Sequence, residues 1–175
     1  MNDGPVTAST PESGTSSRLR NRIGVGLLAA AFAFLAGTII VALQLEGKSP
    51  ADPDNPRQIA LGKSVYERAC ASCHGVNLEG QSDWQAKLPN GRLPAPPHDA
   101  SGHTWHHPDA VLFGMTKFGL LPGKYAPPAY ESDMPAFQST LSDEEIWAVL
   151  AYIKSSWPRE IIKMQRDLTS QQSRR

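Results

Sequence analysis

The sequence has little cysteine and no excess of charge of either sign. Its 175 residues include two cysteines, and 17 basic residues are balanced by 17 acidic ones. The zero net charge argues against the basic surface of a nucleic-acid-binding domain, so we expect no nucleic-acid partner. Two cysteines cannot form the disulfide framework of a small secreted fold, and a second pair for a four-ligand zinc ribbon is missing. We therefore expect both thiols to serve the same site, close to each other in the chain.

Charge is also missing from one long stretch near the N-terminus. Residues 23–45 contain no charged side chain, and their only strongly polar residue is Gln44. A helix needs about 20 such residues to cross the hydrocarbon core of a membrane. Three arginines between residues 18 and 22 precede the run, and Glu46 follows it. The positive-inside rule then predicts a single-pass anchor with a cytoplasmic N-terminus and an exported domain. We expect this anchor to lie in a bacterial inner membrane, with the domain in the periplasm.

A cleaved signal peptide is the alternative to this anchor. Ala31-Phe32-Ala33 has the small-x-small form of a cleavage site. Because this site lies in the middle of the apolar run, an uncleaved anchor is favoured. The predicted layout is a disordered cytoplasmic tail (1–22), the transmembrane anchor (23–45), a Pro-rich linker (46–55), an exported domain (56–158) and a C-terminal helical extension (159–175).

The exported domain lacks the alternating pattern of strands, which predicts an all-α fold. The first helix is expected to begin at Pro56 and to end near Gly75. A shorter helix is expected from Pro108, and the last main helix follows a capping box of Ser142 and Glu145. The segments between these helices are rich in Gly and Pro, which indicates loops.

The two cysteines belong to the motif Cys70-Ala71-Ser72-Cys73-His74. C-x-x-C-H is the pattern of covalent haem attachment. Two thiols one helical turn apart reach the two vinyl groups on one side of a porphyrin, and the next histidine points its imidazole at the iron. A thioredoxin-like C-x-x-C is the alternative, but it needs a strand-rich fold. We therefore expect one covalent haem c.

With this motif, residues 56–158 resemble the class I cytochrome c family. The resemblance also rests on MPAF at 134–137 and on the helix EEIWAVLAYIKSSW at 144–157. It implies an all-α class I cytochrome c fold around one covalent haem, here preceded by a single N-terminal transmembrane helix. In the family the first and last helices cross closely, which here implies contact of Gly62 and Tyr66 with Val149 and Tyr152. A glycine at such a crossing lets two helix backbones approach.

The resemblance also implies two axial iron ligands, His74 and Met134. Met134 precedes a proline in a Pro-rich loop, where it serves no helix packing, and thioether sulfur is a known iron ligand. Met115 is the rival, but it lies in a helical pattern where methionine usually fills the core. Met164 follows the last main helix, and Met1 is predicted to be cytoplasmic.

Residues around the haem are less well specified. In the family a proline carbonyl accepts a hydrogen bond from the other ring nitrogen of the proximal histidine, and here Pro94 or Pro96 fits. We expect the haem crevice or a propionate contact to involve Trp84, Trp105 or Tyr125. Four histidines remain, and they cluster in one loop: His98, His103, His106 and His107. Three interpretations of the cluster are open: hydrogen bonding to a propionate or backbone, a second metal site, and bis-histidine ligation of the haem.

These features predict a one-electron carrier, which is neither an enzyme nor a binder of a small-molecule substrate. The expected partners are a quinol-oxidising complex as donor and a terminal oxidase or reductase as acceptor. One alternative is a cytochrome subunit of a larger oxidoreductase, such as nitric oxide reductase. Others are a haem sensor with a displaceable sixth ligand and a metal-delivery protein that uses the His-rich loop.

Overall fold

The computed structural model of the protein describes residues 1, 4, 32–38 and 49–174. The chain divides into two units, Met1–Gly47 and Lys48–Arg175. In the first unit the described stretch 32–38 is helical. Within the described residues, no helix is long and apolar enough to cross a membrane. Most of the predicted tail (1–22) and anchor (23–45) lies outside these residues, so both stay predictions.

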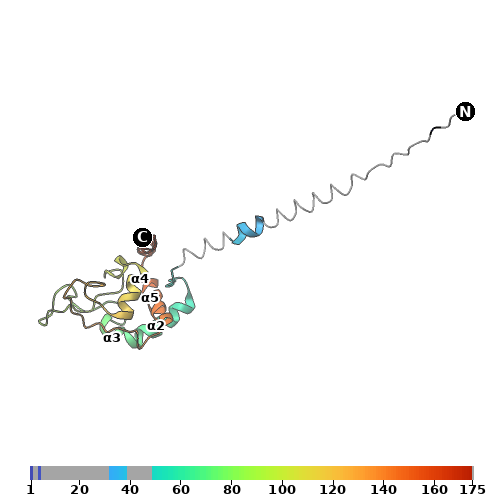
Figure 1. Cartoon of the computed structure of the whole chain (residues 1–175). Helices are drawn as coiled ribbons and strands as arrows, with labels where there is room; N and C mark the ends of the chain where they lie inside the picture. Colours follow the sequence, from blue (N-terminus) through green and yellow to red (C-terminus); the bar gives the residue numbers. More distant parts are fainter. Residues whose placement is uncertain (2–3, 5–31, 39–48, 175) are drawn as a thin grey trace. The chain divides into compact units, whose positions relative to one another are not determined.

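The second unit is built from helices joined by long loops (Figure 1). In its described part no β-strand occurs, and the isolated bridge Pro122–Ala126 is the one β-type pairing there. The all-α prediction is therefore confirmed for this unit. Its helices are α2 (Pro56–Ala69), α3 (Ala71–His74), the 3-10 turn η1 (Thr104–His106), α4 (Asp109–Phe118), α5 (Asp143–Ser155) and α6 (Arg159–Gln172).

Local sequence signals fix the starts of the two principal helices. Asn55 caps α2 by accepting hydrogen bonds from the backbone N–H groups of residues 57 and 58, and Pro56 occupies the first helical position. Ser142 caps α5, and Glu145 completes the capping box by accepting from the Ser142 N–H at 2.9 Å. Both helix starts agree with the sequence prediction.

α2 and α5 cross so closely that only glycine fits at the contact. A methyl group on Gly62 would lie 1.9 Å from the carbonyl oxygen of Ala148 and 2.9 Å from Cβ of Tyr152. One turn further along, the rings of Tyr66 and Tyr152 lie 5.4 Å apart between centroids. Val149 is 1% exposed in the same core. This confirms the helix crossing that the family resemblance implies, and it places the start of the C-x-x-C-H motif directly above the core.

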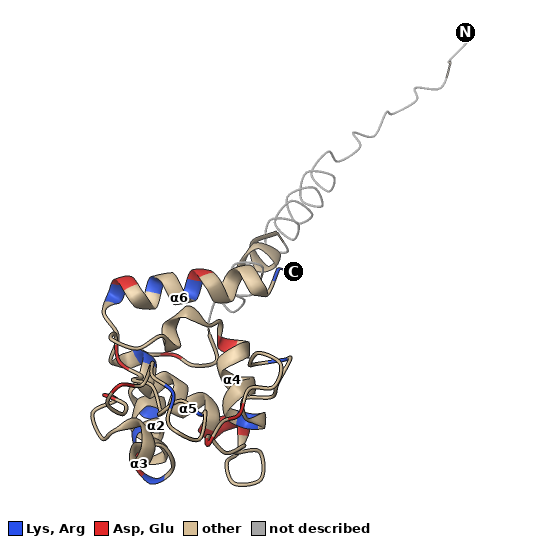
Figure 2. Cartoon of the chain, turned by 90° about the vertical axis from the view of Figure 1, so that its left-hand side faces the viewer, with Lys and Arg blue, Asp and Glu red and all other residues tan. Residues whose placement is uncertain are grey.

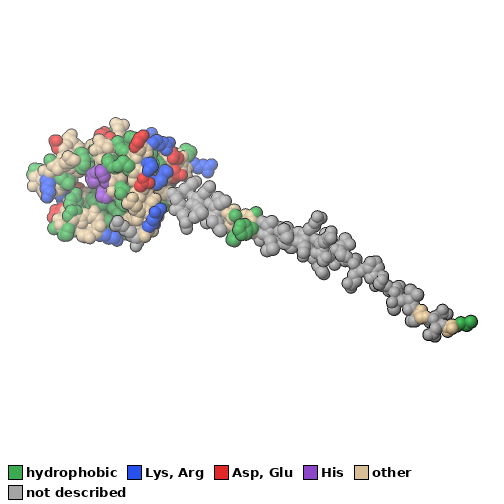
Figure 3. All heavy atoms as spheres, turned by 90° about the horizontal axis from the view of Figure 1, so that it is seen from above, with side chains coloured by type: hydrophobic (Ala, Val, Ile, Leu, Met, Phe, Trp, Pro, Cys, Tyr) green, Lys and Arg blue, Asp and Glu red, His purple; other side chains and the backbone are tan. Residues whose placement is uncertain are grey.

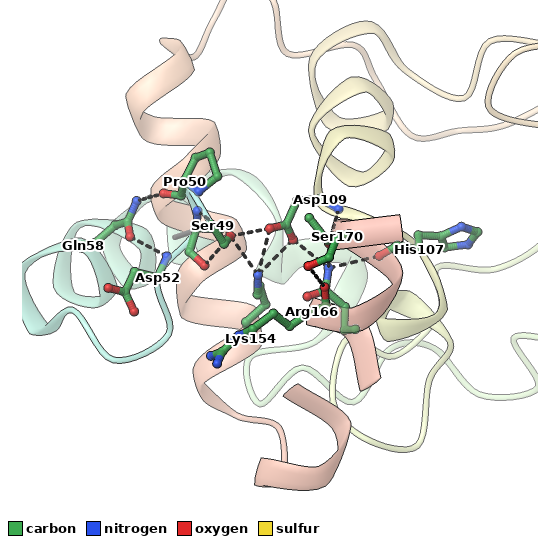
Figure 4. Close-up of polar contacts among 12 residues, drawn as sticks. Ser49, Pro50, Asp52, Gln58, His107, Asp109, Lys154, Arg166 and Ser170 are labelled. Atoms are coloured by element: carbon green, nitrogen blue, oxygen red, sulfur yellow. Dashed lines mark hydrogen bonds and ion pairs between the residues drawn. The ribbon is translucent and has the colours of Figure 1, made fainter. Parts of the chain in front are cut away.

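A buried polar cluster joins α4, α5 and α6, and Figure 4 shows it in close-up. Lys154 Nζ donates to both carboxylate oxygens of Asp109, at 2.9 and 3.1 Å, and each side chain is 3% exposed. Gln165 Nε2 of α6 donates to the same carboxylate at 2.6 Å, and Ser49 Oγ donates to it as well. Figure 2 shows α6 lying across the domain, over α4 and α5. This cluster holds the C-terminal extension, which is helical as predicted.

The segment 49–55, the described part of the predicted Pro-rich linker (46–55), contacts the domain. Ala51 is fully buried, and Gln58 fixes both sides of it, donating to the Pro50 carbonyl at 2.6 Å and accepting from the Asp52 N–H at 2.9 Å. Ser49 also accepts a hydrogen bond from Lys154 Nζ at 3.1 Å. These contacts occur because the buried lysine and carboxylate need polar partners. Residues 49–52 are thus held against the domain by these contacts.

Candidate haem site

The C-x-x-C-H motif lies at a break between two helices. α2 ends at Ala69, Cys70 adopts a non-helical conformation, and α3 continues from Ala71 to His74. The single helix expected from Pro56 to near Gly75 is therefore interrupted at Cys70. Tyr66 holds the end of the motif, because its hydroxyl donates to the Gly75 carbonyl at 2.8 Å. The chain therefore leaves the helix at Cys70, and the buried Tyr66 holds the end of the motif in place.

Both thiols of the motif are free, and their settings differ. Cys70 is partly buried, whereas Cys73 is exposed. Burial raises the pKa of the Cys70 thiol to about 11. Thiol–disulfide oxidoreductases require the opposite, a lowered cysteine pKa that yields a reactive thiolate. This environment disfavours the thioredoxin-like alternative.

The imidazole of His74 is buried and held in one tautomer. Its residue is 8% exposed, and Nδ1 lies 2.8 Å from the carbonyl oxygen of Pro96. A carbonyl only accepts hydrogen bonds, so Nδ1 carries the proton and the Nε2 lone pair is left for a metal. Burial lowers the pKa of His74, which keeps the ring in the neutral, ligating form. Of the two prolines expected to accept this bond, the structure selects Pro96 over Pro94.

The His-rich loop brings its imidazoles against aromatic rings. Figure 3 shows histidine side chains beside hydrophobic ones on one face of the domain. His98 is stacked on His74, with ring centroids 4.0 Å apart. His103 is stacked on Trp84 and meets His107 edge-on. No group of three or more His, Cys, Asp or Glu side chains that would hold a metal ion occurs in the part of the chain that the structure describes. The second-metal interpretation therefore finds no support there.

The stacked position of His98 also bears on bis-histidine ligation. The two axial ligands of a haem lie on opposite faces of the porphyrin. His98 lies face to face with His74, with an angle of 20° between the rings. Two imidazoles stacked in this way cannot point at one iron from opposite sides, so the arrangement disfavours bis-histidine ligation by His74 and His98.

Met134 lies in a loop that is fixed at both sides. Ser132 Oγ accepts the Met134 N–H at 3.0 Å. After Met134, the backbone N–H of Phe137 bonds the Thr116 carbonyl at 3.1 Å, which ties the loop to the end of α4. Before it, Arg92 of the Pro-rich loop forms ion pairs with the carboxylates of residues 131 and 133. Met134 is partly buried.

The two rival methionines are placed differently. Met115 is partly buried within α4, as expected of a methionine that fills a helical core. Met164 is 52% exposed on α6. Met134 is thus the one of these three that lies in a loop, and its role as an iron ligand stays a prediction.

The donor set fits a covalent haem. Two free thiols, of Cys70 and Cys73, stand beside an imidazole with a free Nε2. Trp105 Nε1 is buried and has no hydrogen-bond partner within the described residues. A buried indole N–H normally has an acceptor, and a haem propionate would supply one. Among the three aromatic residues considered from the sequence, this favours Trp105 for the propionate contact.

The comparison with protein families decides the identity of the domain. A sequence model described as cytochrome c matches residues 59–157. The chain belongs to the cytochrome c family. Its cofactor is accordingly haem c, covalently bound. The class I resemblance inferred from the sequence is confirmed.

Curated relatives of this cytochrome come from mycobacteria. Over 70 residues it is 34% identical to the cytochrome bc1 complex cytochrome c subunit of Mycobacterium bovis and to that of Mycobacterium tuberculosis. The aligned stretch covers 39% of this chain and 25% of each relative, so the chain matches about a quarter of their length. No solved structure matches it.

Two features beside the site were missed in the sequence. A methyl group on Gly114 of α4 would lie 2.1 Å from the hydroxyl oxygen of Tyr125, so the loop after α4 packs onto this glycine. The signal was a glycine inside a helical pattern, which often marks close approach. The stacking of His98 on His74 left no such signal, because His74 ends helix α3 and His98 lies in a loop far along the chain.

Proposed function

We propose that this cytochrome is a one-electron carrier, not an enzyme, anchored to a bacterial inner membrane with its haem domain in the periplasm. Cys70 and Cys73 would bind the haem through thioether bonds, and His74 and Met134 would occupy the two axial positions. The observation that carries the proposal is the fixed tautomer of His74. Its Nδ1 is hydrogen-bonded to the Pro96 carbonyl, which leaves Nε2 available to bind iron. The haem iron supplies the one-electron ferrous–ferric couple.

The chain's own residues tune and protect the site. Burial of the His74 ring excludes water from one axial ligand, and low polarity disfavours the additional charge of the ferric state. A thioether ligand at residue 134 acts in the same direction, because sulfur favours the ferrous state. The ties of the Met134 loop to α4 and to Arg92 keep that ligand in place, so that no open position is left for a substrate.

The proposed partners are a quinol-oxidising complex as donor and a terminal oxidase or reductase as acceptor. Cys73, an attachment residue, is exposed, and Val76 just after the motif is 70% exposed. An edge of the haem beside such residues permits a small, transient docking surface of the kind that electron-transfer partners use. The uncharged run 23–45 would keep this surface at the membrane where both partners reside.

The decisive experiment compares Met134→Ala with Met115→Ala in the haem-loaded full chain. We expect Met134→Ala alone to abolish the charge-transfer absorption of methionine-ligated ferric haem and to permit carbon monoxide binding to the ferrous form. Met115→Ala serves as the matched control, because it removes a thioether from the same domain. If both variants keep the spectrum of the wild type, ligation of the iron by Met134 is refuted.

A second function is favoured by one observation. The mycobacterial relatives are named as subunits of a cytochrome bc1 complex, which supports a fixed cytochrome subunit of a larger oxidoreductase. Purification in mild detergent separates the two: a lone cytochrome favours the carrier, and stoichiometric co-purifying subunits favour the complex. A metal-delivery role has weaker support, since no group of three or more His, Cys, Asp or Glu side chains that could hold a metal ion occurs among the described residues.

A further inference from the structure

The proximal histidine is contacted on its ring face as well as at its ring nitrogen. The His98 imidazole lies over that of His74 at a centroid distance of 4.0 Å and an interplanar angle of 20°. His98 is itself immobilised, because its Nδ1 lies 2.8 Å from Thr104 Oγ1 and its carbonyl accepts a hydrogen bond from Trp157 Nε1 at 2.7 Å. Its backbone N–H donates to the Leu78 carbonyl at 2.7 Å.

Two glycines clamp the backbone that carries this contact. A methyl group on Gly80 would lie 2.4 Å from the backbone nitrogen of Pro97, and one on Gly102 would lie 2.0 Å from the Pro97 carbonyl oxygen. The tripeptide Pro96-Pro97-His98 therefore runs between two backbones that approach it as closely as the absence of a side chain allows. Two successive prolines also restrict its conformations. One rigid tripeptide thus presents both the carbonyl of Pro96 and the ring of His98.

We propose that His98 is a positioning residue for His74, which fixes the plane of the proximal imidazole and keeps water from its face. The hydrogen bond to Pro96 holds one ring atom and leaves the ring able to rock about that bond. The parallel contact with His98 removes this freedom, since rocking would drive one ring into the other. This inference rests on the proposed axial role of His74.

Two separable consequences follow from the stacked ring. The orientation of the His74 plane relative to the porphyrin depends on a flat neighbour, whereas exclusion of water depends only on filled volume. A water-free proximal side disfavours ferric charge and raises the reduction potential. A flat ring, a bulky non-planar side chain and a small side chain at position 98 therefore give three different results.

The test uses the haem-loaded full chain with His98→Phe, His98→Leu and His98→Ala, and Thr104→Val as the control that removes only the hydrogen bond to Nδ1. Ligand orientation is measured from the electron paramagnetic resonance of the ferric form and from the paramagnetic shifts of its haem methyl groups. The reduction potential is measured by redox titration. Circular dichroism and haem content show which variants are folded and loaded.

We expect His98→Phe and Thr104→Val to keep one ligand orientation and the potential of the wild type. His98→Leu should keep the potential but give more than one orientation. His98→Ala should give more than one orientation and a lower reduction potential. The ferrous–ferric equilibrium should shift toward the ferric form by up to about tenfold, which is about 59 mV for one electron. If His98→Ala is not folded, the contrast of the Phe and Leu variants decides the matter.

The inference is overturned if folded His98→Leu shows the same single orientation as His98→Phe. It is also overturned if His98→Ala keeps the wild-type orientation and potential. These outcomes differ from a failure of the proposed function, because in that case the wild-type protein itself would lack covalent haem or histidine ligation.

Discussion

Replacing Lys154 by methionine tests the buried polar cluster that joins α4, α5 and α6. Methionine keeps much of the side-chain volume but leaves the Asp109 carboxylate, 3% exposed, without its cation. Breaking a buried ion pair from one side costs about 3–5 kcal/mol, because the remaining charge is buried and uncompensated. The Gln165 amide and the Ser49 hydroxyl still donate to that carboxylate, so we expect the lower end of this range.

The assay is urea unfolding of the haem-loaded protein, monitored by circular dichroism. We expect a loss of about 3 kcal/mol in the free energy of unfolding for Lys154→Met. Adding Asp109→Asn to the same chain should restore part of this loss, since no buried charge is then unpaired. Lys163→Met, which removes an exposed i,i+4 pair of α6, serves as the control and should leave the midpoint unchanged. If Lys154→Met unfolds like this control, the cluster is not a structural element.

Three further changes test other parts of the structure. Gly62→Ala should destabilise the protein by roughly 1–3 kcal/mol in thermal unfolding, because the new methyl group meets the Ala148 carbonyl; a neutral result would refute the close crossing of α2 and α5. Arg92→Ala should speed the displacement of Met134 by added imidazole in stopped-flow absorbance, since it releases the acidic residues before that ligand; an unchanged rate would show that the ion pairs do not hold the loop. The capping bonds of Ser142 lower the pKa of Glu145 below its usual 4.5, so the stability that they contribute is present above pH 4.5 and lost as the pH falls through the lowered pKa. Glu145→Gln should flatten this part of the pH–stability profile, and a profile identical to the wild type would contradict the assignment.

Features that depend on near neighbours in the sequence were predictable. The Asn55 and Ser142 caps involve residues two to three positions apart, so their residue types alone indicate where α2 and α5 begin. The C-x-x-C-H motif is equally local. The crossing at Gly62 was available only through the family resemblance, since a glycine within a helical pattern does not name its partner helix.

Features that depend on distant pairs were not predictable. Lys154 and Asp109 each look like a solvated charge on an amphipathic helix, and only the packing of α6 over them makes both buried. Likewise, Ser49 belongs to a stretch whose polar, Pro-rich composition indicates a linker, and that composition does not show that its hydroxyl contacts this ion pair. His98 is one of four similar histidines in its loop, and nothing in the spacing singles it out as the partner of His74.

The covalent bond between the chain and haem is the central claim, and intact mass spectrometry of the full chain, isolated from a host that attaches haem c, tests it most directly. The account predicts a mass of the polypeptide plus one haem, with the haem located on the peptide that contains Cys70 and Cys73 and retained after denaturation. The mass of the bare polypeptide, without the Soret absorbance of haem, would contradict it.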